Sequence, residues 1–168
     1  QLIESIYKDV EKYKDYCGIA LTEEDARRLK AEGKKAFFIG IENGYGIGKD
    51  IKNVKKYKDM GVQYMTLSHS YDNDICNSSS NTADASKGLT PFGRKVVKEM
   101  NKVGMMIDVS HVSEGTFWDV MKLSKDPVFA SHSSVRALCD HDRNLADDQL
   151  RALAKNGGVI QICIYGGY

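Results

Sequence analysis

The chain has 168 residues, and its 24 Lys and Arg nearly balance its 23 Asp and Glu, which gives a formal net charge of +1. This length suits one domain with its own hydrophobic core, but it is short for a complete (β/α) barrel, which needs about 250 residues. The near-neutral charge removes the electrostatic case for a nucleic-acid partner, and no apolar run approaches the ~20 residues of a membrane span. We therefore expect a single soluble domain over residues 1–168. Its compartment stays open, and an exported or periplasmic parent protein is one alternative because the chain starts at Gln1 rather than Met.

The hydrophobic pattern predicts helices and strands in alternation. Apolar residues at helical spacing predict a helix over about residues 1–15, and Thr22 with Asp25 predicts a capping box that opens a second helix ending near Gly33. Later helices are expected to begin near Asp50, Thr90, Ser113 and Asn144. Short apolar runs predict strands at 36–41, 64–69, 105–110, 128–130 and 159–164. This order favours an α/β fold with a parallel sheet and right-handed crossovers.

Four of the apolar runs end on a residue that can bind a metal ion. These residues are Glu42, His69, His111 and His132, and three of the four histidines in the chain stand in this position. Because the carboxyl ends of barrel strands converge on one mouth, we expect the four side chains to share a pocket. Glu42, His111 and His132 supply one carboxylate and two imidazoles, a set that matches a catalytic zinc site with an open position for water. The fourth histidine, His141, lies in a loop, and we interpret it as solvent-exposed.

Three further polar residues leave alternatives open. His69 could be a metal ligand or a neutral hydrogen-bond donor to a substrate oxygen. Asp108 lies shortly before His111 in the same strand and is expected to point the same way, either as a hydrogen-bond partner of an imidazole or as a polar residue of a barrel layer. Arg143 could clamp a carboxylate through two hydrogen bonds, or form a surface ion pair with a neighbouring aspartate.

The remaining motifs favour structural interpretations. The glycines between Asn43 and Gly48 do not meet the spacing of a dinucleotide loop, so we expect a turn between a strand and a helix. The polar stretch 70–87 is too long for a plain connection, and ordered loops of this length are often functional. No Cys-x-x-Cys pair occurs, so we interpret the thiols as packed or loop residues rather than as disulfides or zinc ligands: Cys17, Cys76, Cys139 and Cys163.

Several of these segments, read together, closely resemble the membrane dipeptidase (renal dipeptidase) family of zinc peptidases. The matching segments are 38–44, 64–69, 88–93, 101–113, 129–133, 143–144 and 156–159. The resemblance covers nearly the whole chain from about Ala36 onward. It implies a TIM-type barrel that hydrolyses the peptide bond of dipeptides with metal-activated water. It also implies that Glu42 bridges two zinc ions, that His111 and His132 complete the ligands of the second ion, that His69 contacts the scissile carbonyl and that Arg143 binds a substrate carboxylate.

The departures from the family pattern bear on activity. The family carries a His-x-Asp pair on its first strand and an aspartate on its last, and this chain has no His-x-Asp and ends at Tyr168, soon after the fifth expected strand. We therefore expect a partial TIM-type barrel of about five parallel strands, with at most one complete zinc site and no activity alone. Its open sheet edges would need a partner chain, a swapped segment or self-association. Asn43 stands where a glycine is usual, a change that we expect to be tolerated. The alternatives are another metal-dependent barrel hydrolase, acting on amides, lactones or phosphoesters, and a non-catalytic module that kept the fold.

Overall fold

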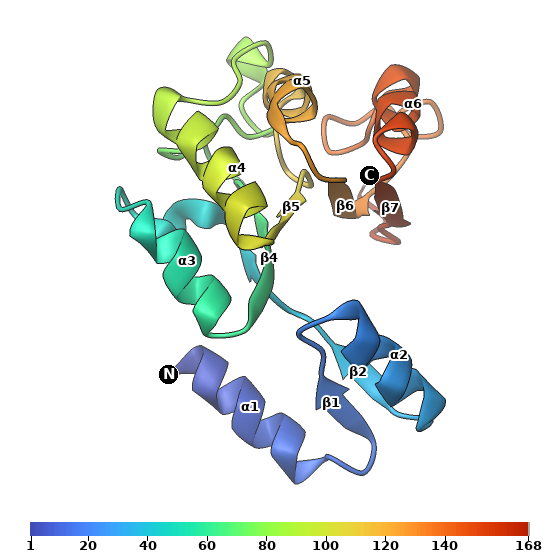
Figure 1. The fold of residues 1–168 in the computed structure, drawn as a ribbon. Coiled ribbons are helices and arrows are strands. Elements are labelled where there is room, and N and C mark those ends of the chain that lie inside the picture. The colour runs from blue at the N-terminus through green and yellow to red at the C-terminus, as the bar shows by residue number, and fades with distance from the viewer. Residues whose placement is uncertain (168) are drawn as a thin grey trace.

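The computed structural model describes residues 1–167, apart from the side chain of Thr82, as an α/β fold (Figure 1). The helices are α1 (Leu2–Lys12), α2 (Glu23–Ala31), α3 (Lys52–Asp59), α4 (Pro91–Val103), α5 (Glu114–Leu123) and α6 (Asp147–Lys155), with two short 3-10 turns at Gly44–Ile47 and Thr82–Asp84. The strands are β1 (Cys17–Ile19), β2 (Lys35–Phe37), β3 (Ile39–Glu42), β4 (Val62–Thr66), β5 (Met106–Asp108), β6 (Phe129–Ser133) and β7 (Val159–Ile162).

Five strands form one parallel sheet, in the order β3-β4-β5-β6-β7. Each strand pairs with the next one along the chain, and a helix connects every pair from β3 to β7, as in a (β/α) barrel. The prediction of about five parallel strands with intervening helices is therefore confirmed.

The expected strand over residues 36–41 is wrong in one respect, because the structure divides it in two. Residues Lys35–Phe37 pair with β1 in a separate two-stranded parallel sheet, whereas Ile39 starts the pairing with β4. Phe38 lies between the two strands and belongs to neither. The apolar run is continuous, so its pattern carries no sign that its two halves have different partners. In Figure 1 the unit formed by α1, β1, α2 and β2 lies at the opposite end of the molecule from α5 and α6.

The predicted helix caps are confirmed at three helices. The Thr22 side chain accepts from Asp25 N in a full capping box, whereas Thr90 accepts from Gly93 N and Ser113 from Thr116 N as simple N-caps of α4 and α5. Asn144 is not a cap. Helix α6 starts after Ala146, whose N–H donates to Gln149 Oε1 over 2.9 Å, while Asn144 Nδ2 donates to the carbonyl of Cys139.

The two faces of the five-stranded sheet have different surroundings. Met65 and Ile107 are fully buried in the hydrophobic core shared with the helices. Side chains alternate along a strand, so the residues next to Met65 and Ile107 point to the opposite face of the sheet. On that face, Met106 is 43% exposed. Glu42, Thr66 and Asp108 lie side by side in register on this second face. The more open face of the sheet therefore carries the polar residues at the carboxyl ends of its strands.

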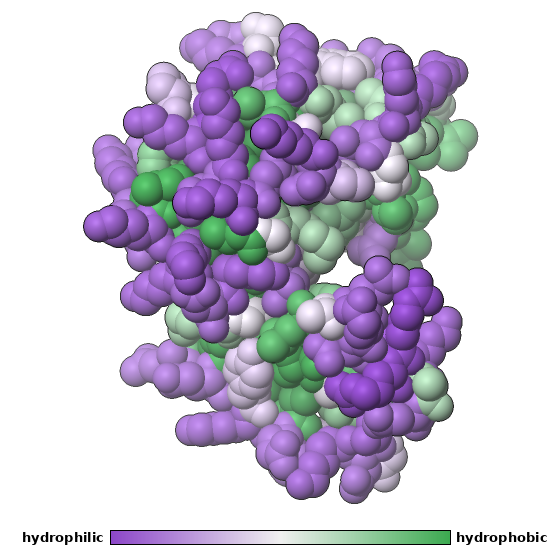
Figure 2. Space-filling view, viewed as in Figure 1, coloured by the Kyte–Doolittle hydropathy of each residue, from purple (hydrophilic) through white to green (hydrophobic). Residues whose placement is uncertain are grey.

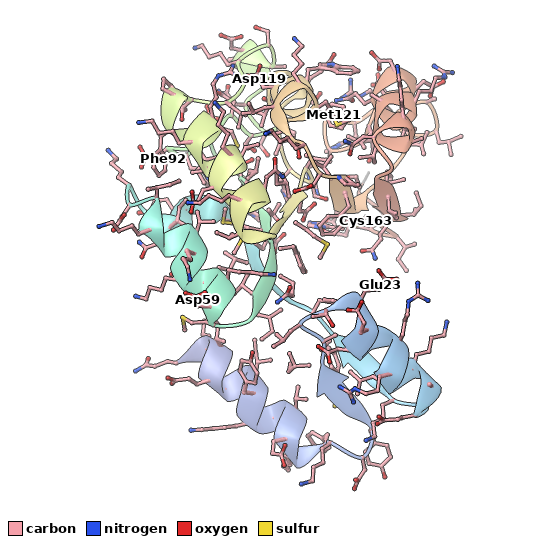
Figure 3. The ribbon with its side chains drawn as sticks, in the orientation of Figure 1. Glu23, Asp59, Phe92, Asp119, Met121 and Cys163 are labelled. Carbon is pink, nitrogen blue, oxygen red and sulfur yellow. The ribbon has the colours of Figure 1, made fainter. Side chains whose placement is uncertain are left out.

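The molecular surface is mostly hydrophilic over α3 and α4, while hydrophobic patches show over the part that holds α1 and α2 and beside β7 (Figure 2). The charged side chains of Glu23 and Asp59 lie exposed on α2 and α3 (Figure 3). Val159 and Ile162 of β7 are exposed although they are apolar. Within residues 1–167, no helix has the length and apolar character required to cross a membrane.

Gly93 shows how tightly α4 packs on the polar stretch 70–87. A Cβ atom at this position would lie 2.0 Å from the carbonyl oxygen of Ile75, which itself accepts from Thr90 N. We expect Gly93→Ala to lower the free energy of unfolding by about 1–3 kcal/mol, because backbone atoms must move to relieve the contact. Urea unfolding followed by Trp118 fluorescence measures this change. Gly46→Ala is the control, since no atom lies within 4 Å of its added Cβ, and equal stability of the two variants would contradict the expectation.

Candidate metal centre

Glu42, His69, His111 and His132, here called the strand-end cluster, converge at one end of the sheet. Glu42 is the last residue of β3, and His132 lies within β6. His69 and His111 each follow the last residue of a strand, β4 or β5, by three positions. Because Glu42, Thr66 and Asp108 are in register, the three strands end at the same level. The four side chains therefore come together as the sequence predicted, while their roles as ligands or substrate contacts stay predictions.

The carboxylate of Glu42 lies at the centre of the strand-end cluster. Its Oε1 atom is 3.1 Å from His132 Nε2, 3.3 Å from His111 Nε2 and 3.6 Å from His69 Nε2. The Nε2 atoms of His111 and His132 are 2.8 Å apart, and the rings of His69 and His111 lie 4.2 Å apart between centroids. All three imidazoles thus direct the same ring nitrogen at one carboxylate oxygen.

The separations from Glu42 Oε1 fit a set of metal ligands. Two ligand atoms bound to one tetrahedral ion at about 2.1 Å lie about 3.4 Å from each other. The distances from Glu42 Oε1 to the three Nε2 atoms surround this value. Candidate ligand atoms of Glu42, His69 and His111 lie within 4.8 Å of one another, and His132 adds a further nitrogen to the same oxygen. Carboxylate and imidazole ligands suit a divalent transition metal such as zinc.

His111 is the most enclosed member of the strand-end cluster. Its side chain is 9% exposed, against 32% for His132 and 42% for His69. Burial lowers the pKa of His111 from 6.5 to about 3, with smaller contributions from the positive charges of Arg143, His69 and His132. The ring is therefore neutral at pH 7, which is the form that can bind a metal ion.

The backbone is strained at two positions of this site. Among residues 1–167, Asn43 and His111 are the non-glycine residues with positive φ, at 75° and 68°. The carbonyl of His111 accepts hydrogen bonds from Ser79 N and from the hydroxyls of Ser68 and Ser78. Positive φ at Asn43 is a conformation that favours glycine, the residue that the family resemblance implies at this position. Such strain persists only where surrounding contacts hold it, and it concentrates at functional sites.

The polar stretch 70–87 supplies many of these contacts. Ser78 Oγ lies within hydrogen-bond reach of the carbonyls of both His69 and His111, which share its single proton. Asn73 Nδ2 donates to Asn43 Oδ1 and to the carbonyl of Leu67. The stretch is therefore an ordered support of the strand-end cluster rather than a plain connection.

Arg143 lies beside the strand-end cluster. It is 7% exposed, and its Nη2 donates to the carbonyl of His132 over 3.1 Å. Its own N–H donates to His141 Nδ1, and His141 is exposed, as the sequence predicted. This placement holds the Arg143 side chain near the imidazoles, whereas binding of a carboxylate by Arg143 stays a prediction.

Sequence reasoning was wrong about Asp108, and it missed several hydroxyl residues that support the strand-end cluster. Asp108 and His111 are three residues apart and the strand ends at Asp108, so the expectation that their side chains point the same way is wrong. The Asp108 carboxylate instead contacts Thr66 and Ser131. A signal was present in the sequence, because a serine directly precedes each of the three clustered histidines: Ser68, Ser110 and Ser131.

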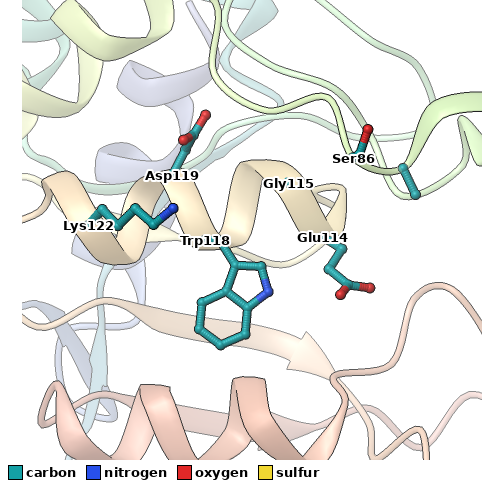
Figure 4. A pocket seen from close by; sticks show the side chains of 7 residues that line it. Ser86, Glu114, Gly115, Trp118, Asp119 and Lys122 are labelled. Carbon is teal, nitrogen blue, oxygen red and sulfur yellow. The ribbon is translucent and has the colours of Figure 1, made fainter.

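A cavity of about 520 Å³ lies elsewhere, between α5 and residues 85–86 (Figure 4). Trp118 and Lys122 line it, together with Glu114 and Asp119. Both carboxylates have partners, since Asp119 accepts from Leu89 N and Arg94, and Glu114 lies 3.4 Å from Arg136. No member of the strand-end cluster lines this cavity, and we assign it no role.

Comparison with known proteins places the chain in a family. The profile of the family described as Membrane dipeptidase (Peptidase family M19) matches residues 1–168. The chain belongs to the membrane dipeptidase family. Dipeptidase tcpJ of Claviceps purpurea (strain 20.1) is 37% identical over 162 residues, which cover 96% of this chain and 38% of that protein. The resemblance stated from the motifs is thereby confirmed.

Solved structures share the fold. An amidohydrolase from Pseudomonas aeruginosa superposes with a TM-score of 0.88 at 30% identity, over 95% of this chain and 48% of that one. A metallo peptidase from Rhodobacter sphaeroides, liganded with a phosphinate mimic of the dipeptide L-Ala-D-Ala, superposes with a TM-score of 0.81 at 26% identity, over 87% of this chain and 43% of that one. The chain spans between 33% and 42% of the length of three curated relatives that are named as dipeptidases.

Proposed function

We propose that this chain carries part of the active site of a zinc-dependent dipeptidase, which hydrolyses the peptide bond of dipeptides. The observation that supports the proposal most directly is the convergence of three imidazole Nε2 atoms on Glu42 Oε1, at 3.1–3.6 Å. Membership of the membrane dipeptidase family supports the choice of substrate. The proposal concerns the whole protein, since this chain spans less than half of the curated relatives.

Glu42, His111 and His132 are the proposed zinc ligands. His111 is buried and neutral, and His132 and Glu42 are more exposed, so the ligand set faces the open side of the sheet. When bound, zinc would act as a Lewis acid that polarises a carbonyl and lowers the pKa of water. The resemblance implies two zinc ions in the family, and the residues named here account for one.

His69 and Arg143 are the proposed substrate-binding residues. The His69 Nδ1 atom lies 2.8 Å from Ser70 Oγ, which orients the ring, and its Nε2 faces the strand-end cluster. A neutral His69 that carries its proton on Nε2 would donate to the scissile carbonyl oxygen as negative charge develops there. Arg143, anchored on the carbonyl of His132, would bind the free carboxylate of the dipeptide.

The phosphinate mimic of L-Ala-D-Ala in the Rhodobacter sphaeroides peptidase supports dipeptides with a D-residue on the carboxyl side as one substrate class. Hydrolysis of another amide is the second candidate, because a Pseudomonas aeruginosa structure of the same fold is called an amidohydrolase.

The free edges of β3 and β7 would be covered by further strands of the same fold or by self-association of the chain.

Removal of zinc tests the proposal. The full-length protein, treated with a chelator and dialysed, is expected to lose hydrolysis of alanyl dipeptides and to regain it when zinc is added back. Turnover is followed by chromatography of the released amino acids, and zinc content by elemental analysis, with an N-acyl amino acid tested in parallel for the second candidate. Undiminished dipeptide hydrolysis by protein shown to be free of metal would contradict the proposal.

A further inference from the structure

Asp108 connects three strands at the base of the strand-end cluster. It is the last residue of β5, and it is fully buried. Its Oδ1 accepts from the backbone N–H groups of Ser110, over 2.9 Å, and Ser131, over 3.0 Å. Its Oδ2 accepts from Thr66 Oγ1 on β4, over 2.6 Å, and from Ser131 Oγ on β6, over 2.5 Å. The carboxylate therefore accepts four hydrogen bonds from β4, β6 and the end of its own strand.

The hydroxyl of Ser131 joins this carboxylate to His132. Ser131 Oγ lies 2.7 Å from His132 Nδ1, on the side of the ring away from Glu42. A hydroxyl group has one proton to donate, and Ser131 donates it to Asp108 Oδ2. The bond to His132 must therefore run from Nδ1–H to Ser131 Oγ. His132 then carries its proton on Nδ1 and has a lone pair on Nε2.

The Ser110 hydroxyl completes the arrangement. Ser110 Oγ accepts from the backbone N–H of His132 over 3.0 Å, and it lies 3.5 Å from Ser131 Oγ. The backbone and the ring of His132 are thus held by two neighbouring serines, and both serines are bonded to the same buried aspartate.

We propose that Asp108 and Ser131 are positioning residues that fix His132 in its Nδ1–H tautomer and direct its Nε2 lone pair at the metal. The role of this tautomer in binding zinc rests on the proposed function. The tautomer itself is inferred from the hydrogen bonds of Ser131 and does not depend on that function. Partners of this kind, which hold a metal-binding histidine through its other nitrogen, typically change metal affinity about 10- to 100-fold when they are lost. His69 differs from His132 in this respect, because its Nδ1 atom contacts Ser70, whose side chain is exposed to water rather than bonded to a buried carboxylate.

The tautomer is tested first in the unaltered chain, free of metal and at a pH where the ring is neutral. Proton–nitrogen correlation spectra of 15N-histidine-labelled protein distinguish Nδ1–H from Nε2–H, and loss of one signal set in His132→Gln assigns the residue. We expect the Nδ1–H form. A dominant Nε2–H form, or a mixture of both, would overturn the proposal whether or not the chain binds zinc.

Asp108→Asn tests the direction of the hydrogen bonds. The two backbone N–H groups require the amide oxygen at the Oδ1 position, which places the amide nitrogen opposite Ser131. Ser131 Oγ would then accept from the amide and donate to His132 Nδ1, so His132 should switch to the Nε2–H form. Zinc affinity, from a competition titration with a chromophoric chelator, should fall about 10- to 100-fold. A folded variant with an unchanged tautomer would contradict the assignment.

Ser131→Ala should weaken zinc binding by a similar factor, and Ser131→Thr should restore it because it keeps the hydroxyl. Ser133→Ala is the matched control on the same strand, since the buried Ser133 Oγ has no hydrogen-bond partner. Equal zinc affinity in Ser131→Ala and Ser133→Ala would refute the role of Ser131. Failure of the unaltered chain to bind zinc would instead count against the proposed function, while the spectra would still decide the tautomer.

Discussion

His111→Ala is expected to lower the zinc affinity of this chain about 100- to 1,000-fold. Zinc binding in small protein sites contributes about 10–16 kcal/mol, which is about 2.5–4 kcal/mol for each of four ligands. His111 is the least exposed member of the strand-end cluster and lies 3.3 Å from Glu42 Oε1 and 2.8 Å from His132 Nε2. Its low pKa also means that protons do not compete with the metal at neutral pH.

Titration of the metal-free chain with zinc, in competition with a chromophoric chelator, measures this change. His141→Ala is the control, because it removes the one histidine outside the strand-end cluster, and it should keep full zinc affinity. Circular dichroism establishes that both variants are folded. If His111→Ala and His141→Ala bind zinc equally well, the three imidazoles do not form the metal centre.

His69→Ala is expected to reduce kcat for dipeptides about 100- to 1,000-fold in the full-length protein while zinc content stays unchanged. A loss of this size is typical when a donor to a developing oxyanion is removed. His69 is the farthest of the three imidazoles from Glu42 Oε1, at 3.6 Å, and its side chain is the most exposed of them, at 42%. Both observations suit a residue that contacts substrate rather than one that holds the ion.

Elemental analysis of zinc, made on the same preparation as the kinetic measurement, separates the two roles of His69. Ligand atoms of Glu42, His69 and His111 lie within 4.8 Å of one another, so these three also form a possible ligand set. Loss of zinc from His69→Ala, to the extent seen in His111→Ala, would assign His69 to the metal and leave His132 as the substrate contact.

The convergence of the strand-end cluster could be predicted from the sequence because it depends only on strand order and strand ends. Glu42, His111 and His132 each lie at or near the end of an apolar run, and parallel strands in sequential order bring such ends together. The capping residues Thr90 and Ser113 could also be predicted, because a helix cap depends only on residues within one turn of the helix start.

Features that depend on contacts distant in sequence could not be predicted in this way. The division of the run 36–41 into two strands depends on pairing of Lys35–Phe37 with β1, a strand of three residues that is too short to show a pattern. The link from Thr66 through Asp108 to Ser131 joins residues 42 and 23 positions apart, which neither periodicity nor spacing records. Positive φ at His111 likewise follows from tertiary hydrogen bonds to its carbonyl.

Ser78 has a consequence for redesign of this enzyme family. Its single hydroxyl proton is shared by the carbonyls of His69 and His111, and it belongs to the polar stretch 70–87, which supports the strand-end cluster. A protein engineer who shortens or exchanges this loop to admit a new substrate would also remove an anchor from two imidazoles. Loop grafts that keep Ser78 and its two acceptors should therefore retain metal more often than grafts chosen for pocket shape alone.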